Sequence, residues 1–350
     1  MTSRGRLTIK EVAEAAGVST QTVSRVINNR PDVAAETFER VQQIITDTGY
    51  SPNMFARGLT QGRSHSLGIV AYGLEYFGPS RVLTGIEQQA AGMGYSISLN
   101  LIHEPEILDV EGLLSSLFSR QVDGIIWAVP DVGDNRLWSN TVGTDPPAPV
   151  LMVGGMGGQS KLGSIGIDNR AIGRMATEHL LAGGARHIGI ITGPMNWWES
   201  RQRQLGWRES LQEQGLPAAD RQIVNGDWGA TSGEEGLYRL IDQEPDLDAV
   251  FASNDQMALG VLHAAHRLGR RVPEELSVVG VDNIAESSHF WPALTTVDQP
   301  LGDAGGLAVR ELDSAMRRAR SARRGQDTTV APRTLLQPQL IVRESSRPRP

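Results

Sequence analysis

Residues 7–28 read LTIKEVAEAAGVSTQTVSRVIN, and this stretch predicts two short helices joined by a tight turn. Thr8 and Glu11 have the spacing of a capping box, in which each side chain accepts a hydrogen bond from the other residue's backbone amide. Gly17 suits the residue that follows a helix, and Ser19 suits the residue that precedes one. Two helices joined by a short turn containing glycine form a helix-turn-helix, so we expect a DNA-binding unit here. A third helix is expected over residues 34–48.

The second helix of this pair presents a polar face without acidic side chains. Gln21 can read adenine and Arg25 can read guanine in the major groove, because each offers two hydrogen bonds to one base. Shorter side chains such as Thr22 suit phosphate contacts, which set the position on DNA without reading sequence. The alternative is a small three-helix bundle with a solvated polar face. The candidate DNA-binding residues of this unit are Thr8, Ser19, Thr20, Gln21, Thr22, Ser24, Arg25 and Asn28.

Charge is unevenly distributed along the chain. Residues 1–63 carry eight lysine and arginine against six acidic residues, whereas the whole chain of 350 residues has a net charge of −7. A small basic unit on an acidic body suits a DNA-binding module fused to a domain that does not contact DNA. The chain has no cysteine, which excludes disulfides and thiolate chemistry. No stretch approaches the roughly 18 consecutive apolar residues of a membrane span, and no signal segment opens the chain, so we expect a cytoplasmic protein without membrane contact.

Beyond residue 64, apolar strands alternate with amphipathic helices. Strands are expected at 67–71, 95–101, 123–128, 149–153, 187–191, 222–224, 249–252 and 277–280, and helices at 80–92, 109–120, 170–182, 199–214, 231–243, 256–268 and 301–319. Continuous apolar strands between helices indicate parallel sheets covered on both faces, and such sheets bind ligands beyond the carboxyl ends of their strands. The sequence therefore predicts two doubly wound α/β lobes with a cleft between them.

Residues 7–28 and 49–53 resemble the headpiece of the lactose-repressor (LacI/GalR) family almost position by position, and the likeness continues along nearly the whole chain. The resemblance implies an all-α headpiece at 1–51, a hinge helix at 52–63 and a bilobed, periplasmic-binding-protein-like domain at 64–343, followed by a tail at 344–350. Lobe 1 would take about 64–166 and 301–328, and lobe 2 about 167–298 and 329–343.

The expected hinge helix is too short to be stable alone in water. The resemblance implies that it orders on DNA beside a partner helix, in the minor groove. Leu59 would insert between bases at a central step, and Ala56 would lie where the two hinge helices approach. Asn53 completes the candidate DNA contacts of this segment. A plain flexible linker is the alternative.

Polar side chains that follow strands are the candidate ligand contacts. A sugar presents hydroxyls that both donate and accept, which Arg203, Asn254 and Asp282 can satisfy from different loops. The resemblance implies inducer contacts for these three residues and for Trp228 and Gln256. The full candidate set is Tyr76, Trp197, Arg203, Trp228, Asn254, Gln256, Asp282 and Leu301.

Departures from the family pattern point to a different sugar. Ala128 and Gly154 stand where sugar-bonding side chains are expected, whereas Tyr76 and Trp197 replace smaller residues. A larger ligand, such as an oligosaccharide or β-glycoside, is the resulting expectation.

Three residues near these segments have competing interpretations. Trp207 lies inside a predicted helix and is expected in the core. Asp255 could cap its helix or meet the ligand. Trp291, beside Pro292, could pack against a loop or belong to the aromatic surface that a sugar needs. His263 and His266 lie three residues apart on one helix, but nothing else nearby supports a metal, so neither a metal nor a cofactor is expected.

The expected function is repression of carbohydrate-metabolism genes. A homodimer would bind pseudo-palindromic double-stranded operator DNA, and a saccharide in the cleft would release it. Two alternatives are a solute-binding protein that delivers sugar to a transporter and a member of the same family activated by a co-repressor. An enzyme is not expected, because no nucleophile–base arrangement stands out.

Overall fold

The computed structural model describes residues 8–27, 29–50, 63–105, 109–133, 135, 147–154, 162–322 and 333–347. The chain divides into two compact units, Met1–Ser64 and His65–Pro350.

The first unit is a helix-turn-helix followed by a third helix. Its helices are α1 (Ile9–Ala16), α2 (Thr20–Ile27) and α3 (Ala35–Thr48). The predicted capping box is present, because the amide of Thr8 donates to Glu11 Oε2 at 2.6 Å and the amide of Glu11 donates to Thr8 Oγ1 at 3.5 Å. Gly17 ends α1 in the left-handed conformation, with φ of +62°. Val12, Val23, Val26 and Val41 form the centre of a core that all three helices share.

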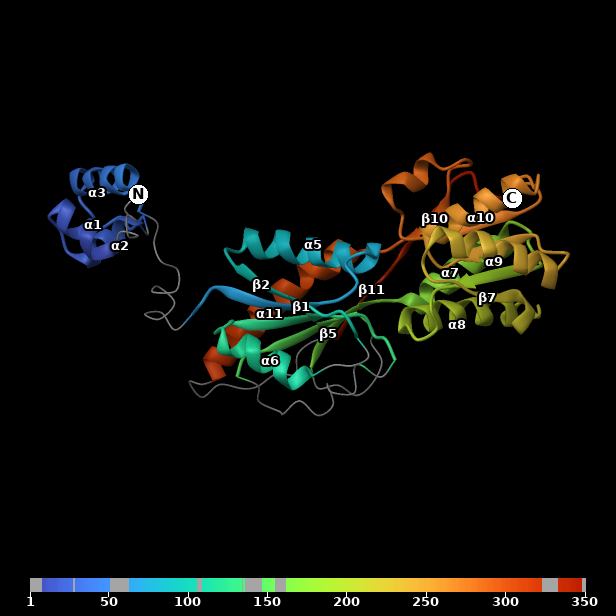
Figure 1. The fold of residues 1–350 in the computed structure, drawn as a ribbon, viewed down its shortest axis with the longest axis horizontal. Helices are drawn as coiled ribbons and strands as arrows, with labels where there is room; N and C mark the ends of the chain where they lie inside the picture. The colour runs from blue at the N-terminus through green and yellow to red at the C-terminus, as the bar shows by residue number, and fades with distance from the viewer. Residues whose placement is uncertain are drawn as a thin grey trace. The chain divides into compact units, whose positions relative to one another are not determined.

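The second unit contains two mainly parallel sheets, each of six strands among the described residues (Figure 1). The first sheet has the order β11-β5-β4-β3-β1-β2, and the second has the order β12-β10-β9-β8-β6-β7. Every described pairing is parallel except that of β12 with β10. The elements of the first lobe are β1 (Ser66–Ala71), α5 (Phe77–Gly92), β2 (Ser96–Leu101), α6 (Val110–Ser119), β3 (Gly124–Ala128), β4 (Val150–Val153), β5 (Gly163–Ile167), α11 (Leu301–Ala322) and β11 (Arg333–Leu336).

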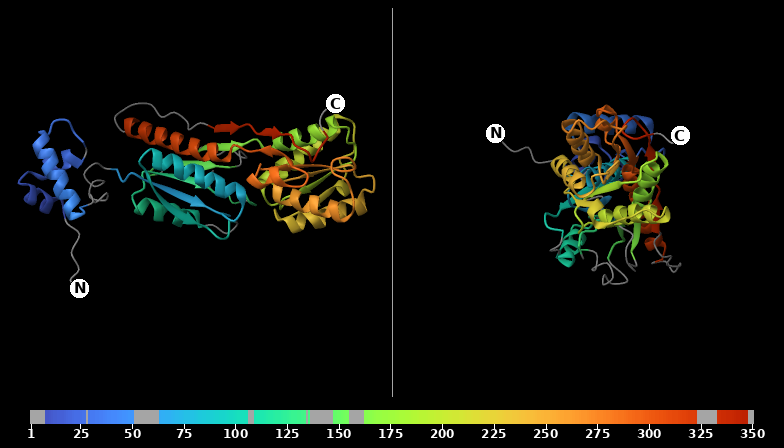
Figure 2. Two further views of the ribbon diagram at one scale, coloured as in Figure 1. Left: turned by 90° about the horizontal axis from the view of Figure 1, so that it is seen from above. Right: turned by 90° about the vertical axis from the view of Figure 1, so that its right-hand side faces the viewer.

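Helices cover both faces of the first sheet. On β1, Leu67 and Ile69 pack with α5 and α11, whereas Val70 packs with α6, as the two-residue period of a strand requires. The helices α5 and α11 lie side by side (Figure 2). Their backbones approach so closely that a Cβ on Gly85 would lie 2.1 Å from the carbonyl oxygen of Gly302.

The second lobe repeats this plan. Its elements are α7 (Asn169–Ala182), β6 (Ile188–Thr192), α8 (Trp198–Glu213), β7 (Ile223–Asn225), α9 (Ala230–Gln243), β8 (Ala249–Ala252), α10 (Asp255–Arg267), β9 (Ser277–Val281), β10 (Thr295–Asp298) and β12 (Gln339–Ile341). Along β8, Phe251 faces α7 and α8, and Val250 faces α9 and α10. The predicted fold class of a helix-turn-helix followed by two doubly wound lobes is confirmed.

Two predicted boundaries near the C-terminus were wrong. The chain was expected to return to lobe 2 near residue 329, but β11 pairs with β5 in the first sheet, so the crossing lies between Leu336 and Gln339. Residues 344–350 were expected to form a tail. Instead Ser345 is fully buried, and its hydroxyl donates to the carbonyl of Val278 at 2.7 Å. The first error comes from a short strand, and the second from an irregular segment; both are held by partners distant in sequence.

Candidate functional site

A cavity of about 350 Å³ lies beyond the carboxyl ends of strands from both lobes. Parallel sheets place their loops at this edge, which is why segments far apart in sequence meet there. All eight side chains predicted to bind ligand line it: Tyr76 and Leu301 from the first lobe, and Trp197, Arg203, Trp228, Asn254, Gln256 and Asp282 from the second. Ala128 and Gly154 also line it, so the expected departures face the same space.

Arg203 lies at the centre of a buried polar network. From α8, its Nε donates to Asn169 Oδ1 at 2.8 Å, Nη1 donates to the carbonyl of Ser253, and Nη2 donates to Gln299 Oε1 at 3.2 Å. Gln299 Nε2 in turn donates to Asp282 Oδ1. Gln299 therefore bridges the buried cation and the buried anion, and the network fixes both before any ligand enters.

Burial sets the electrostatics of this network. Loss of solvent raises the pKa of Asp282 to about 6, although the nearby Arg203 charge lowers it. Burial also lowers the pKa of the Arg203 guanidinium, and the nearby charge of Asp282 opposes this decrease. Behind Asp282, burial and the neighbouring carboxylate raise the pKa of Asp255 to about 8. The base of the cleft thus combines one buried cation with two carboxyl groups that resist ionisation.

The helix α10 begins in this network. Asn254, not Asp255, caps it, because Asn254 Oδ1 accepts from the amide of Met257 at 2.8 Å. The same side chain donates to the carbonyl of Trp228 at 2.9 Å and to Gln256 Oε1 at 3.0 Å. Asp255 instead accepts from the hydroxyl of Thr296 at 2.6 Å. Neither interpretation of Asp255 was therefore right, since it is fully buried and supports the loop that carries Asp282.

Aromatic rings form a second wall of the cavity. The ring of Trp197 meets those of Tyr76 and Trp228 edge to face, at centroid distances of 5.3 and 5.7 Å. Arg203 lies 5.6 Å from the Trp228 ring centroid, within reach of a cation–π contact. Trp228 has φ of +74°, which is rare for a non-glycine residue and occurs at sites where the surroundings enforce it. A Cβ on Gly193 would lie 2.2 Å from this ring, so a glycine there makes room for Trp228.

The two lobes are joined by backbone bonds at the edge of this aromatic wall. Val132 and Trp197 form an antiparallel bridge. The amide of Gly133 donates to the carbonyl of Asn196, and the amide of Trp198 donates to the carbonyl of Asp131, each at 2.8 Å. The loops after β3 and β6 therefore hold the lobes together beside Trp197.

Sequence reasoning missed several residues of the cavity. Asn169 and Gln299 bond Arg203, and both lie where the chain crosses between lobes, which was the available signal. Glu75, Glu199 and Asp227 also line the cavity but were not singled out.

For two tryptophans that were not among the predicted ligand contacts, the sequence suggested packing against the rest of the protein. Trp207 is fully buried, so the prediction that it belongs to the core is confirmed. Trp291 is 91% exposed, so the interpretation that it packs against a loop was wrong.

In the first unit, five of the candidate DNA contacts lie on α2. Thr20, Gln21 and Arg25 are exposed on α2. Ser19 accepts from the amide of Thr22 at 3.1 Å, and Arg25 pairs with Asp32 at 3.5 Å. Thr8 belongs to the capping box, and Ser24 lies half-buried. The remaining candidates, Asn28, Asn53, Ala56 and Leu59, lie outside the described residues.

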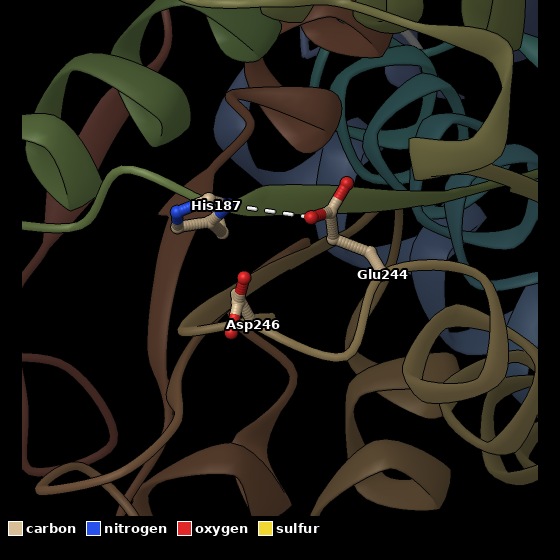
Figure 3. Close-up of side chains that lie close together, drawn as sticks. All are labelled: His187, Glu244 and Asp246. Atoms are coloured by element: carbon tan, nitrogen blue, oxygen red, sulfur yellow. Dashed lines mark hydrogen bonds and ion pairs between the residues drawn. The ribbon is translucent and has the colours of Figure 1, made fainter.

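A group of possible metal ligands lies at the other end of β6. The side chains of His187, Glu244 and Asp246 come together there (Figure 3). His187 Nδ1 is 3.3 Å from one oxygen of Glu244, and Arg221 Nε donates to the other oxygen at 2.7 Å. Because a guanidinium already neutralises Glu244, we interpret the group as a structural ion pair.

Among the described helices, none is both long and apolar enough to cross a membrane.

A helix-turn-helix unit followed by a two-lobed domain with a polar and aromatic cleft defines a DNA-binding regulator that responds to a ligand. Residues 8–53 match the family model of bacterial regulatory proteins, lacI family, and residues 177–346 match that of a periplasmic binding protein-like domain. Catabolite control protein A of Priestia megaterium is 32% identical over 311 residues, which cover 89% of this chain and 92% of that protein. The chain belongs to the LacI family of bacterial transcriptional repressors, with a DNA-binding unit followed by an effector-binding domain.

Two solved structures extend the comparison. The lac repressor dimer bound to operator and the anti-inducer ONPF has a TM-score of 0.83 and 29% identity, over 97% of this chain and 98% of that one. The complex of the transcriptional regulator CelR with cellobiose has a TM-score of 0.69 and 30% identity, over 97% of this chain and all of the other.

Proposed function

We propose that this repressor acts in the cytoplasm as a homodimer that binds a pseudo-palindromic operator and releases it when a saccharide fills the interlobe cleft. The observation that carries the proposal is the cavity in which a fixed Arg203–Gln299–Asp282 network faces an aromatic wall. The protein would act as a regulator of carbohydrate-metabolism genes and not as an enzyme.

The chemistry of the cavity favours a saccharide. Hydroxyl groups that donate and accept suit the amides of Asn254 and Gln256 and the carboxyl of Asp282. The apolar face of a pyranose ring suits an aromatic surface such as that of Trp228. The indole N–H of Trp228 is buried and has no hydrogen-bond partner among the described residues. Since a similar chain binds cellobiose, a β-linked disaccharide of glucose is the first effector to test.

DNA recognition would use α2 of each protomer in successive major grooves. The exposed side chains of Gln21 and Arg25 would read bases, while Ser19, Thr20, Thr22 and Ser24 would set the position on the backbone. Residues 52–63 would form paired hinge helices in the minor groove, with Asn53, Ala56 and Leu59 at the contact.

The proposed coupling runs from the cleft to the hinge. A saccharide between the lobes would favour one arrangement of the lobes, and that arrangement would be incompatible with paired hinge helices. A coupling free energy of about 1–3 kcal/mol is typical of such linkage. This corresponds to a loss of operator affinity of roughly 5- to 150-fold.

A mobility-shift titration with a pseudo-palindromic duplex tests the ligand part. Cellobiose at saturation should weaken operator binding by the wild type, and Trp228→Leu should weaken the response because it removes one ring of the wall. Tighter operator binding with cellobiose would reverse the proposed direction and make the sugar a co-repressor. Failure of a panel of mono- and disaccharides to change operator affinity would refute a saccharide effector.

A pair of arginine variants tests the DNA part. Arg25→Ala should lower operator affinity and change the preferred bases, because a bidentate contact with guanine contributes about 1–3 kcal/mol. Arg40→Ala removes the same charge from the exposed surface of α3 in the same unit and serves as the control. Equal effects of both variants on cognate and random duplexes would show that Arg25 contributes charge alone.

A further inference from the structure

The charge of the cavity lining narrows the class of saccharide. Among the described residues that line the cavity, Arg203 is the one basic side chain, whereas Glu75, Glu199, Asp227 and Asp282 are acidic. The three nitrogens of Arg203 already donate to Asn169, Ser253 and Gln299. Its charge faces Asp282, so it is not free to neutralise an anion in the ligand.

Helix N-termini at the cleft would ordinarily attract anions, because their backbone N–H groups carry a partial positive charge. Three helices that begin at this cavity, α5, α8 and α9, have no side-chain capping bond. Each of them brings a carboxylate of its own. Glu75 precedes α5 by two residues, Glu199 lies in the first turn of α8, and Asp227 precedes α9 by three residues.

These carboxylates come from both lobes and from three separate segments of the chain. Asp227 Oδ1 accepts from the amide of Gly229, the residue before α9, at 2.8 Å. Hydrogen bonding with the Ser232 side chain and this bond with Gly229 lower the pKa of Asp227, which therefore stays ionised at neutral pH. A phosphate that approached any of these three N-termini would thus meet a carboxylate of the protein close by. A sugar hydroxyl, in contrast, can donate to a carboxylate.

We propose that the cleft selects uncharged saccharides and rejects phosphorylated or acidic sugars, and that Glu75, Glu199 and Asp227 are the residues that impose this selection. The inference rests on the proposed function of the cleft as a saccharide site. It adds the charge class of the ligand and assigns a role to three residues that sequence reasoning missed. Like charges brought together in a binding site disfavour the complex strongly, so the discrimination is expected to reach at least about 100-fold.

Isothermal titration of the full-length protein with cellobiose, cellobiose 6′-phosphate and glucose 6-phosphate tests the selection. The wild type should bind cellobiose at least about 100-fold more tightly than its phosphate. The triple variant Glu75→Gln/Glu199→Gln/Asp227→Asn should bind cellobiose 6′-phosphate more tightly. The ratio of the affinity for cellobiose to the affinity for its phosphate should therefore fall at least about tenfold. Equal or tighter binding of the phosphorylated sugar by the wild type would overturn the inference.

A matched control separates a local effect from overall charge. Glu87→Gln/Glu235→Gln/Glu286→Gln removes the same charge from exposed positions outside the cavity, and it should leave the ratio unchanged. If the affinity ratio fell as much in this control as in the triple variant of the cavity acids, the inference would also be overturned. The single variant Glu75→Gln, at an exposed position, provides a second test if the triple variant does not fold.

Failure of the proposed function is distinguishable from failure of this inference. If the wild type binds none of these sugars, cellobiose is excluded as the effector, and titration with inorganic phosphate still tests the charge argument. The triple variant should then gain phosphate binding that the wild type and the control variant lack. No gain in the triple variant would overturn the role given to the three acids.

Discussion

Replacement of Arg203 by leucine tests whether the polar network at the base of the cleft is a coupled unit. The variant removes three donated hydrogen bonds and leaves Asn169, Gln299 and the carbonyl of Ser253 without this donor. It also leaves the buried Asp282 carboxyl without an opposing charge. Removal of one partner of a buried charge pair costs about 3–5 kcal/mol, so the free energy of unfolding should fall by that amount.

The loss of unfolding free energy in Arg203→Leu should depend on pH, and the pKa of Asp282 determines whether it grows or shrinks as pH rises. The folded-state pKa of Asp282 is about 6, above the ordinary value of 3.8. Protonation of this carboxyl therefore stabilises the folded state at low pH, and this contribution is lost as pH rises through 6. Without Arg203 this pKa should rise further, because the nearby charge that lowers it is gone. The variant should therefore lose more stability at pH 7.5 than at pH 5.

Urea unfolding of the wild type, Arg203→Leu and Arg203→Leu/Asp282→Asn at both pH values provides the measurement. The double variant should recover about 1–2 kcal/mol at pH 7.5, because the uncompensated charge is gone, and its stability relative to the wild type should vary less with pH. A loss below about 1 kcal/mol, or the same loss at both pH values, would refute a coupled network.

Three further changes test other parts of the structure. Asp255→Asn removes a carboxyl whose pKa of about 8 makes the folded state less stable as pH rises, so the wild type should lose about 2 kcal/mol relative to this variant between pH 6 and pH 8 in chemical denaturation. Gly193→Ala places a Cβ 2.2 Å from the Trp228 ring, and calorimetric titration should show at least about tenfold weaker binding of cellobiose because the ring must move. Thr8→Ala removes the capping box and should lower the stability of the first unit by about 1 kcal/mol in a circular-dichroism melt; an unchanged melt would show that the cap contributes nothing.

Local patterns in the sequence predicted the features that depend on neighbouring residues. The capping box needs only Thr8 and Glu11, and the lobe helices follow from apolar spacing within one segment. The strands β5, β10, β11 and β12 were not predicted. Three of them have only three or four residues, and all four lie near the crossings between the lobes, where their stability comes from pairing across the sheet. Pairing of Arg333–Leu336 with β5 is a long-range choice that no local pattern encodes.

The same division holds within the cleft. Residues that directly follow strands, such as Asn254 and Asp282, could be placed at its edge because parallel strands end there. Gln299 and Asn169 could not be assigned to Arg203, since their contact depends on how the crossings between lobes bring separate segments together. Asp255 follows Asn254 in sequence, but it is fully buried, and its carboxyl accepts a hydrogen bond from Thr296 in the interior.

The order of strands has a consequence for synthesis of the chain on the ribosome. The first sheet begins at Ser66 but needs Arg333–Leu336 to complete its edge, and the second sheet needs Gln339–Ile341. Contacts between residues so distant in sequence form slowly, since loop closure must come first. The helix-turn-helix has its own core within the first 50 residues and can fold early, so a prematurely ended chain would keep a DNA-reading unit while lacking a finished sensor. Faithful regulation by this protein therefore depends on synthesis proceeding past Gln339–Ile341.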